Sequence, residues 1–425
     1  MLDAALNGSA PLVAKLLALG ANPHAVSKHG ATALMLASDH GSSSCVKLLI
    51  PLSDVTRVDC AGLSALDRAI DAAASGRSQA SSSQECLSML APLSNLSMRD
   101  SNGDLPLIRA AGSGSLLAVS ILLAAGADPR GLGRDGRDAL MAAALHKHVD
   151  VVEALSGICD PKLSSLSGAT ALGLGCRMLG SLEQRRSSLA IAKILMPLCD
   201  PLCPTGDGHS LLLVAISSGY MLEANGPAIE MVKLLIPFSN LEAKSPETGG
   251  TALHAAAKLS RPEVAMSLLA AGANPNALDD QGFSPLLISV RERQMRCIEV
   301  LAPASSPHVL GSKAHPMVTA AARADLPAVA ALLPWCDPLA RNPDGRDAIM
   351  AAADASSREC IEFLLPHCDL KLRDARGMSA AEIAKMRGAI EEGLIIEAYA
   401  TSMAERAELS GLGPGERPRP KAPRL

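Results

Sequence analysis

One stretch of the sequence, Gly249-Gly-Thr-Ala-Leu-His-Ala-Ala-Ala257, contains the pattern that organises the chain. The phrase Gly-x-(Thr/Ser/Asp)-(Ala/Pro)-Leu returns about every 33 residues. Clear copies begin at Gly30, Gly62, Gly136, Gly168, Gly249, Gly282 and Gly345, and weaker copies begin at Gly103, Gly208, Lys313 and Gly377. A period of this length predicts that the 425 residues form a stack of repeats instead of two or three globular domains.

The position before Ala or Pro in each phrase has the chemistry of a helix N-cap. A short side chain with an oxygen can accept a hydrogen bond from an unpaired N–H of the first helical turn. Nine of the eleven copies have one there, namely Thr32, Ser64, Asp138, Thr170, Ser210, Thr251, Ser284, Asp347 and Ser379, whereas Leu105 and His315 are exceptions. The glycine two residues earlier allows a tight turn with positive φ. Each phrase therefore predicts a turn followed by a helix start.

A second apolar helix begins about twelve residues after the leucine of each phrase, as in Cys45-Val-Lys-Leu-Leu-Ile50. Three of these helices end in Gly-Ala-(Asn/Asp)-Pro, at Gly20, Gly126 and Gly272, whereas seven end at a proline, namely Pro51, Pro92, Pro197, Pro237, Pro303, Pro334 and Pro366. Proline ends a helix because it removes a backbone donor. In three units, those of Leu66, Leu172 and Leu212, eight or nine extra residues separate the helices. We expect the polar insertions 72–83 and 180–188 to protrude, either as tolerated loops or as partner contacts.

This combination resembles the ankyrin repeat, whose signature is a period of 33 with Thr-Pro-Leu-His-x-Ala. The resemblance implies an all-α ankyrin-repeat solenoid of paired antiparallel helices with β-hairpin fingers over residues 1–399. About eleven complete repeats are expected, with a partial first repeat over Leu2–Asn22, which suggests a truncated start, and a charged capping repeat at the other end. Residues 400–425 are expected to form a short helical extension and a disordered Pro/Arg-rich tail.

Composition excludes several classes of function. The net charge of −4 argues against nucleic-acid binding through bulk charge, and the six aromatic residues are too few for base-stacking platforms. The longest apolar run, 116–127, is too short to span a membrane, and no secretory signal is evident at the start. Eleven cysteines scattered over a long chain fit reduced thiols, so we expect a cytoplasmic protein. We also expect a monomer, and the scarcity of aromatic residues predicts an aliphatic core of Ala and Leu.

Motifs that could carry chemistry are weak. Gly131-Leu-Gly-Arg-Asp-Gly136 formally fits a dinucleotide fingerprint, but that motif works only after a buried strand and before the phosphate-binding helix, whereas here it lies in a hairpin finger, so no cofactor is expected. The Cys199/Cys203 pair with His209, or the pair His146/His148, could hold a metal, yet no second paired set completes four ligands. Most cysteines recur at two repeat positions and are interpreted as small core residues. The sequence therefore predicts no enzyme, with metal-assisted activity in these Cys/His loops as a remote alternative.

The ankyrin resemblance implies that a protein partner binds the concave surface formed by the finger tips and the first helices. The residue after the turn glycine should face outward, which selects Arg137, His209, Phe283, Arg346 and Met378, and the ends of first helices add Arg109, Lys258, Arg291, Arg293 and Arg323. Arg and aromatic residues are frequent hot spots, although each of these could also be an ordinary solvated side chain. Phe283 is the favoured anchor because no core is evident for its ring, and Trp335 is a second candidate.

These observations predict a noncatalytic protein–protein interaction scaffold or inhibitor. A regulatory or targeting subunit of an enzyme and a host-directed effector are the alternatives. The tail segment Arg417-x-x-Pro420-x-x-Pro423 fits a ligand of an SH3-like groove, but so short a motif arises readily by chance, and the tail is also interpreted as solubilising.

Overall fold

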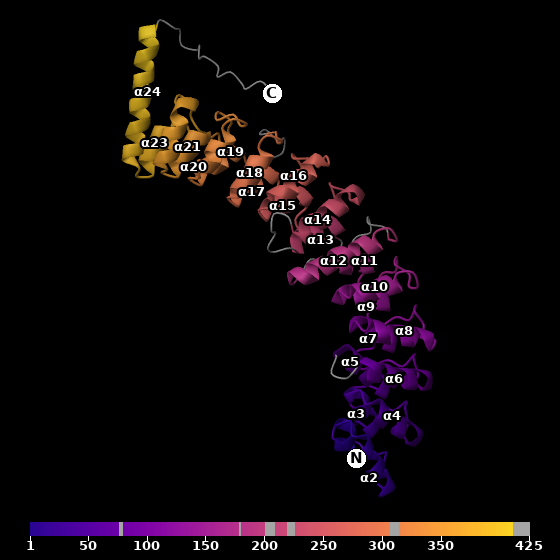
Figure 1. Ribbon diagram of the computed structural model, residues 1–425. Helices are drawn as coiled ribbons and strands as arrows, with labels where there is room; N and C mark the ends of the chain where they lie inside the picture. The colour runs from indigo at the N-terminus through magenta and orange to yellow at the C-terminus, as the bar shows by residue number, and fades with distance from the viewer. Residues whose placement is uncertain (76–79, 178–179, 200–208, 219–225, 307–313, 411–425) are drawn as a thin grey trace. The chain divides into compact units, whose positions relative to one another are not determined.

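The computed structural model describes residues 1–75, 80–177, 180–199, 209–218, 226–306 and 314–410. Over these residues the chain is a succession of short helices joined by turns (Figure 1). It divides into two compact units, residues Met1–Asn240 and Leu241–Leu425. In each unit the helices alternate between a first helix, which follows the turn phrase, and a second helix, which packs against it.

Unit 1 contains seven helix pairs within its described residues. The pairs are α1 (Leu2–Leu6) and α2 (Ala10–Ala18), α3 (Ala33–His40) and α4 (Ser43–Leu49), α5 (Ala65–Ser75) and α6 (Ala80–Leu90), α7 (Pro106–Gly112) and α8 (Leu116–Ala124), α9 (Ala139–His146) and α10 (Val149–Leu155), α11 (Ala171–Gly175) and α12 (Leu182–Leu195), and α13 (Leu211–Ser218) and α14 (Pro227–Leu235).

Unit 2 contains five pairs within its own described part. They are α15 (Ala252–Lys258) and α16 (Pro262–Ala270), α17 (Pro285–Arg291) and α18 (Met295–Leu301), α19 (Pro316–Ala322) and α20 (Leu326–Leu332), α21 (Ala348–Asp354) and α22 (Arg358–Leu364), and α23 (Ala380–Met386) and α24 (Ile390–Ser410). Helix α24 is continuous across position 399, where the sequence analysis divides the solenoid from a helical extension.

The predicted helix starts are confirmed. In eight of the nine predicted caps the side-chain oxygen accepts the N–H three residues on, and these are Thr32, Ser64, Asp138, Thr170, Ser210, Ser284, Asp347 and Ser379. At Thr251 the backbone N–H instead donates to Nδ1 of His254. The turn glycine has positive φ, from 65° at Gly249 to 82° at Gly103.

Stacking of equivalent helices forms the core of each unit. First helices pack on first helices, as α3 on α5 and α7 on α9 do, and second helices pack on second helices, as α4 does on α6. The leucine of the turn phrase is buried throughout; Leu34, Leu140 and Leu253 are at most 1% exposed. The buried core residues are mostly Ala, Leu, Val and Ile, as the composition predicts.

The fingers are turns with little β structure in the described residues. Two isolated antiparallel bridges occur, Val26 with Thr32 and Ser164 with Thr170, so the β-hairpins implied by the family resemblance are not seen as strands. Successive fingers are instead linked by backbone hydrogen bonds, such as Arg134 N–H to the Gly103 carbonyl (3.1 Å) and Leu166 N–H to the Asp135 carbonyl (3.0 Å). These links fix each finger relative to its neighbour.

Second helices end in two ways, as their sequences predict. Gly20, Gly126 and Gly272 have φ of 81–91°, in the left-handed region. Four of the prolines lie in 3₁₀ turns that continue the helix, η1 (Ile50–Leu52), η2 (Ala91–Leu93), η3 (Ile236–Phe238) and η4 (Leu365–His367). The residue that follows the proline then faces solvent, with Leu93 52% and Phe238 51% exposed.

Where the structure describes them, the insertions are helical instead of forming loops. Residues 72–75 extend α5, residues 80–83 begin α6, and most of 180–188 forms the first two turns of α12. The insertions lengthen the helices, and Ala72, Ser83 and Ser188 are at most 3% exposed. Residues 180–184 and 186 are exposed, so this insertion protrudes as the sequence predicts. Residues 76–79 and the third insertion, between α13 and α14, lie largely outside the described residues. No helix of the described chain is both long and apolar enough to cross a membrane.

Candidate protein-binding surface

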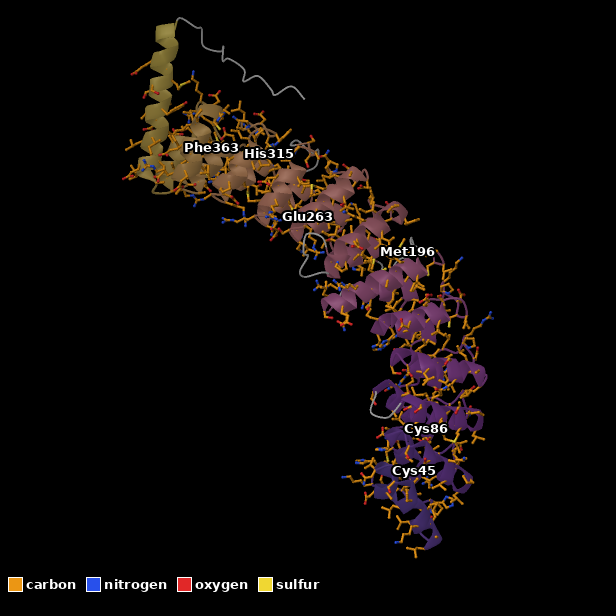
Figure 2. All side chains as sticks on the ribbon, in the orientation of Figure 1. Cys45, Cys86, Met196, Glu263, His315 and Phe363 are labelled. Carbon is orange, nitrogen blue, oxygen red and sulfur yellow. The ribbon has the colours of Figure 1, made fainter. Side chains whose placement is uncertain are left out.

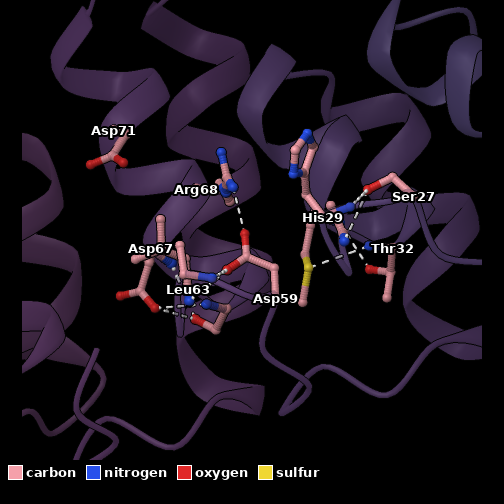
Figure 3. Close-up of polar contacts among 12 residues, drawn as sticks. Ser27, His29, Thr32, Asp59, Leu63, Asp67, Arg68 and Asp71 are labelled. Atoms are coloured by element: carbon pink, nitrogen blue, oxygen red, sulfur yellow. Dashed lines mark hydrogen bonds and ion pairs between the residues drawn. The ribbon is translucent and has the colours of Figure 1, made fainter. Parts of the chain in front are cut away.

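The candidate surface is the finger–helix surface, which we define as the first helices together with the turns that precede them. An aspartate at the start of a finger organises several of these turns. One Asp59 oxygen accepts the N–H groups of Ala61 and Leu63, and the other accepts a guanidinium N–H of Arg68 on α5 (Figure 3). Burial opposes ionisation of Asp59, but these hydrogen bonds outweigh it and hold its pKa below the usual value. The finger and its helix are therefore locked together by one carboxylate.

Arg109, a predicted partner contact on α7, binds the aspartate of its own finger as Arg68 does, and it also binds an aspartate of the preceding repeat. Its guanidinium donates to Asp100 of its own finger at 2.8 Å and to both oxygens of Asp71 on α5 at 3.0 and 2.7 Å. The side chain of Arg109 is 21% exposed and that of Asp100 only 2%. Arg109 therefore holds two repeats together, and its side chain remains partly exposed.

A pocket of about 380 Å³ lies on this surface between the α7 and α9 repeats, and we call it the α7–α9 pocket. Its charged lining consists of Asp71, Asp100, Asp104, Asp135, Arg109 and Arg137. The predicted contact Arg137 pairs with Asp135 of its own finger at 2.7 Å. Burial and the neighbouring Asp100 raise the pKa of Asp104. Burial, His148 and Arg137 lower the pKa of His146, which also lines the pocket, so this imidazole is neutral at pH 7.

In unit 2, Arg346 occupies the position that Arg137 occupies in unit 1, within the phrase Asp344-Gly-Arg-Asp347. Its guanidinium lies 3.3 Å from Asp354 and 3.6 Å from Asp374 of the next finger. Arg387 also binds Asp354, with two bonds of 2.8 and 3.0 Å. The bonds from Arg387 chiefly lower the pKa of Asp354, so the carboxylate stays charged between two guanidiniums.

Phe283, the favoured anchor, has a partner that the sequence did not suggest. The guanidinium carbon of Arg291 lies over the Phe283 ring, 4.4 Å from its centroid. Nε2 of the buried His254 lies 3.0 Å from the Phe283 carbonyl oxygen and fixes the backbone beneath the ring. Phe283 is half-buried and Arg291 is exposed, so two predicted contacts form one cation–π pair at the surface of unit 2.

The other predicted contacts are more loosely held or lie elsewhere. Arg293 donates to the carbonyl of Arg323 at 2.8 Å, and both side chains lie at the ends of neighbouring first helices. Lys258 is the exposed last residue of α15, and His209 is a half-buried residue shortly before α13. Of the ten predicted contacts, Arg109, Arg137 and His209 belong to unit 1, and the other seven belong to unit 2.

Sequence reasoning missed a set of side chains that link repeats at the ends of first helices. Lys147 has φ of 68°, a backbone conformation that favours glycine, and its Nζ donates to the carbonyls of Leu174 and Gly175 at 2.8 Å each. Nε2 of the next residue, His148, lies 3.0 Å from the Gly112 carbonyl of the preceding repeat. The sequence did carry a signal for Lys147. It occupies the position after first helix α9 that Gly41 occupies after α3, and both residues have a left-handed backbone conformation.

Seven of the eight cysteines interpreted as core residues are buried, and the eighth, Cys199, is half-buried. Of the ten described cysteines, eight are buried, and Cys45 and Cys86 lie on the successive second helices α4 and α6 (Figure 2). Cys159 and Cys199 share another repeat position, just after a second helix, and their thiols donate hydrogen bonds to the preceding repeat. Cys159 donates to the Pro129 carbonyl (3.3 Å) and Cys199 to the Pro161 carbonyl (3.2 Å). No group of three or more His, Cys, Asp or Glu residues is placed to hold a metal ion in the part of the chain that the structure describes. Cys203 lies outside that part.

Comparison with protein families agrees with this architecture. A family model described as ankyrin repeats (3 copies) matches residues 1–90, 73–165, 178–279 and 220–309. These segments together include residues 1–165 and 178–309, which is more than half of the chain. No curated protein matches the sequence. On the family match and on the stacked helix pairs, the chain belongs to the ankyrin-repeat family.

Proposed function

We propose that this chain is a noncatalytic scaffold or inhibitor that binds a protein partner on the finger–helix surface. The observation that carries the proposal is the ankyrin-repeat match over most of the chain, because ankyrin repeats generally mediate protein–protein interaction. A stack of repeats offers an extended surface instead of a closed active site. The chain then acts through surface complementarity, as a monomer in the cytoplasm, and does not bind nucleic acid.

The way charged side chains are held on this surface supports the proposal. Arg109 and Arg346 are fixed by buried or half-buried carboxylates, and the finger-to-finger bonds hold the turns that carry them. A side chain that is already ordered loses less conformational entropy when a partner binds. Fixed guanidiniums of this kind are suited to recognition of a partner, and Arg is frequent among hot spots.

The Phe283–Arg291 pair is the proposed anchor in unit 2. The guanidinium restrains the aromatic ring while the exposed side of the pair stays open to solvent. An aromatic ring with a cationic edge can bury apolar area and also pair with an acidic group of the partner. Lys258, Arg293 and Arg323 would contribute charge around this anchor.

An affinity capture from native lysate with the full-length chain tests this proposal. The wild type is compared with the double variant Phe283→Ala/Arg291→Ala and with the control variant Arg358→Ala, whose side chain lies on the second helix α22. We expect one stoichiometric protein with the wild type and with the control, and at least a tenfold loss with the double variant. Equal capture by all three chains would remove the pair from the binding surface.

The identity of the captured protein separates the alternatives. An enzyme as partner would make this chain a regulatory or targeting subunit, and a partner from another organism would favour a host-directed effector. Metal-assisted activity is tested separately, by metal analysis of the purified wild type beside Cys199→Ser/Cys203→Ser. Stoichiometric zinc that the double variant loses would support that activity and contradict a purely noncatalytic role.

A further inference from the structure

The α7–α9 pocket has a chemical character that the proposed function does not require. Its lining carries four carboxylates and two guanidiniums, which gives a formal charge of −2 with His146 neutral. Both guanidiniums are already engaged, Arg109 with Asp71 and Asp100, and Arg137 with Asp135. The pocket is therefore acidic, although both of these arginines are predicted from the sequence as basic contacts.

One carboxylate of the pocket stays available. The side chain of Asp104 makes no hydrogen bond or ion pair within the described residues, and it is half-buried in the pocket lining. The finger opposite makes room for it at Gly133, where a Cβ atom would lie 2.6 Å from Oδ1 of Asp104. A half-buried carboxylate without a partner is costly unless a cation pairs with it.

The rest of the lining suits a long side chain with a charged end. Ile108, Ala142 and Leu145 supply apolar atoms beside the carboxylates. Lysine and arginine bury their methylene stems on apolar surface and keep the charged head near polar groups. A volume of about 380 Å³ is at the small end of ligand pockets and is sufficient for one such side chain with water.

A metal ion does not explain the pocket, because its carboxylates, like the other described His, Cys, Asp and Glu residues, do not converge in a group of three or more. We propose that the α7–α9 pocket receives an arginine or lysine side chain of the protein partner, with Asp104 as the carboxylate that pairs with its charged head. Arg109 and Arg137 hold the surrounding aspartates in place for this pairing. The assignment rests on the proposed function in that the basic residue belongs to a protein.

A peptide titration tests the pocket without knowledge of the partner. The full-length chain, labelled with ¹³C at isoleucine δ1 methyls, is titrated with the capped tripeptide acetyl-Ala-Arg-Ala-amide, and its lysine and citrulline analogues are titrated in parallel. Citrulline keeps the shape of arginine and lacks its charge. The Ile108 methyl, assigned by its loss in Ile108→Val, reports binding in the pocket. Asp104→Asn is compared with Glu153→Gln, which neutralises an exposed carboxylate on α10.

We expect the arginine or lysine peptide to shift the Ile108 methyl with at least tenfold higher affinity than the citrulline peptide. Asp104→Asn should abolish this preference, and Glu153→Gln should keep it. Equal shifts with the basic and citrulline peptides, or a preference that survives Asp104→Asn, would overturn the assignment. If the basic peptide binds as expected but no protein is captured from lysate, the proposed function fails and the pocket chemistry stands.

Discussion

The guanidinium of Arg109 donates two hydrogen bonds to the carboxylate of Asp71, at 3.0 and 2.7 Å. The two residues belong to successive repeats and are 38 positions apart in the sequence. Because Arg109 also pairs with the buried Asp100, its removal leaves both carboxylates without a guanidinium. The other oxygen of Asp100 still accepts the N–H groups of Asn102 and Asp104. The stability of this interface and the acidity of the α7–α9 pocket thus depend on the same side chain.

We predict that Arg109→Ala lowers the local free energy of opening of α5 and α7 by about 1–3 kcal/mol, because it leaves one oxygen of the buried Asp100 carboxylate without a donor. The matched change Arg358→Ala removes the exposed pair with Glu362, 2.8 Å long, and should have a much smaller effect because solvent screens this pair. Hydrogen exchange of the native full chain measures both, since repeats open locally instead of in one two-state transition. Similar costs for the two variants would contradict the role given to Arg109.

Asp347 shows a cost of using aspartate as a cap. One of its oxygens accepts the Met350 N–H at 3.0 Å, whereas the other is buried without a hydrogen-bond partner among the described residues. Burial raises the pKa of Asp347 above its usual value near 3.8. The folded state therefore holds the proton more tightly, and the free energy of unfolding falls as pH rises from about 3.8 through the raised pKa.

Asp347→Ser keeps a capping oxygen and removes the buried charge. We expect it to raise the free energy of opening of α21 at pH 7 by about 1 kcal/mol, and the gain should disappear as pH falls below about 3.8, where the aspartate is protonated in both states. Hydrogen exchange at several pH values follows the difference. The comparison variant Ser284→Ala loses a cap without removing a charge, and it should destabilise α17 at every pH. A loss of stability in Asp347→Ser at pH 7 would be the contrary result.

Two residues in left-handed conformation should respond oppositely to glycine. Ser356 has φ of 54° and its side chain is exposed, so Ser356→Gly should be neutral or stabilising by up to about 1 kcal/mol. Lys147 has φ of 68°, but Lys147→Gly also removes two 2.8 Å bonds to the end of α11. We predict a loss of about 1–2 kcal/mol in the opening of α11, again by hydrogen exchange. Equal effects of the two substitutions would show that the lysine bonds contribute nothing.

Thiol reactivity should separate the surface cysteine from the core cysteines. Burial raises the pKa of Cys86, Cys159 and Cys336 to about 12, whereas Cys60 is exposed. At pH 8 iodoacetamide should therefore label Cys60 in the native chain within minutes and leave the other three unmodified until denaturant is added. Peptide mapping by mass spectrometry gives the extent at each site, and early labelling of Cys86 would show that the core between α4 and α6 opens.

Local features of the fold could be predicted from the sequence because each depends on neighbouring residues. The cap at Ser284, the proline that starts α17 and the positive φ of Gly282 all follow from one short phrase. The length of the insertion helices could not be predicted this way. Ser188 reads as a polar loop residue, yet it is buried and donates to the Arg177 carbonyl at 3.1 Å. Its burial depends on what packs against it in space.

The charged site shows the same limit. The segments 135–144 and 344–353 are nearly identical, and both carry an arginine after the turn glycine. Arg137 pairs within its own finger, whereas Arg346 reaches Asp354 and the next finger. The position equivalent to Asp354 in the earlier copy is Leu145, so the same phrase meets different neighbours. A sequence phrase can select the arginine, but the adjoining repeat decides what it binds.

The central claim, recognition of a protein by the finger–helix surface, is tested most directly by a three-way affinity capture read by quantitative mass spectrometry. It compares the wild-type full chain, the surface variant Phe283→Ala/Arg291→Ala/Asp104→Asn, and the tail variant Pro420→Ala/Pro423→Ala, whose changes lie outside the described residues. Our expectation is a stoichiometric partner that the wild type and the tail variant retain and that the surface variant captures at least tenfold less. A partner retained by the surface variant and lost by the tail variant, or no partner at all, would contradict it.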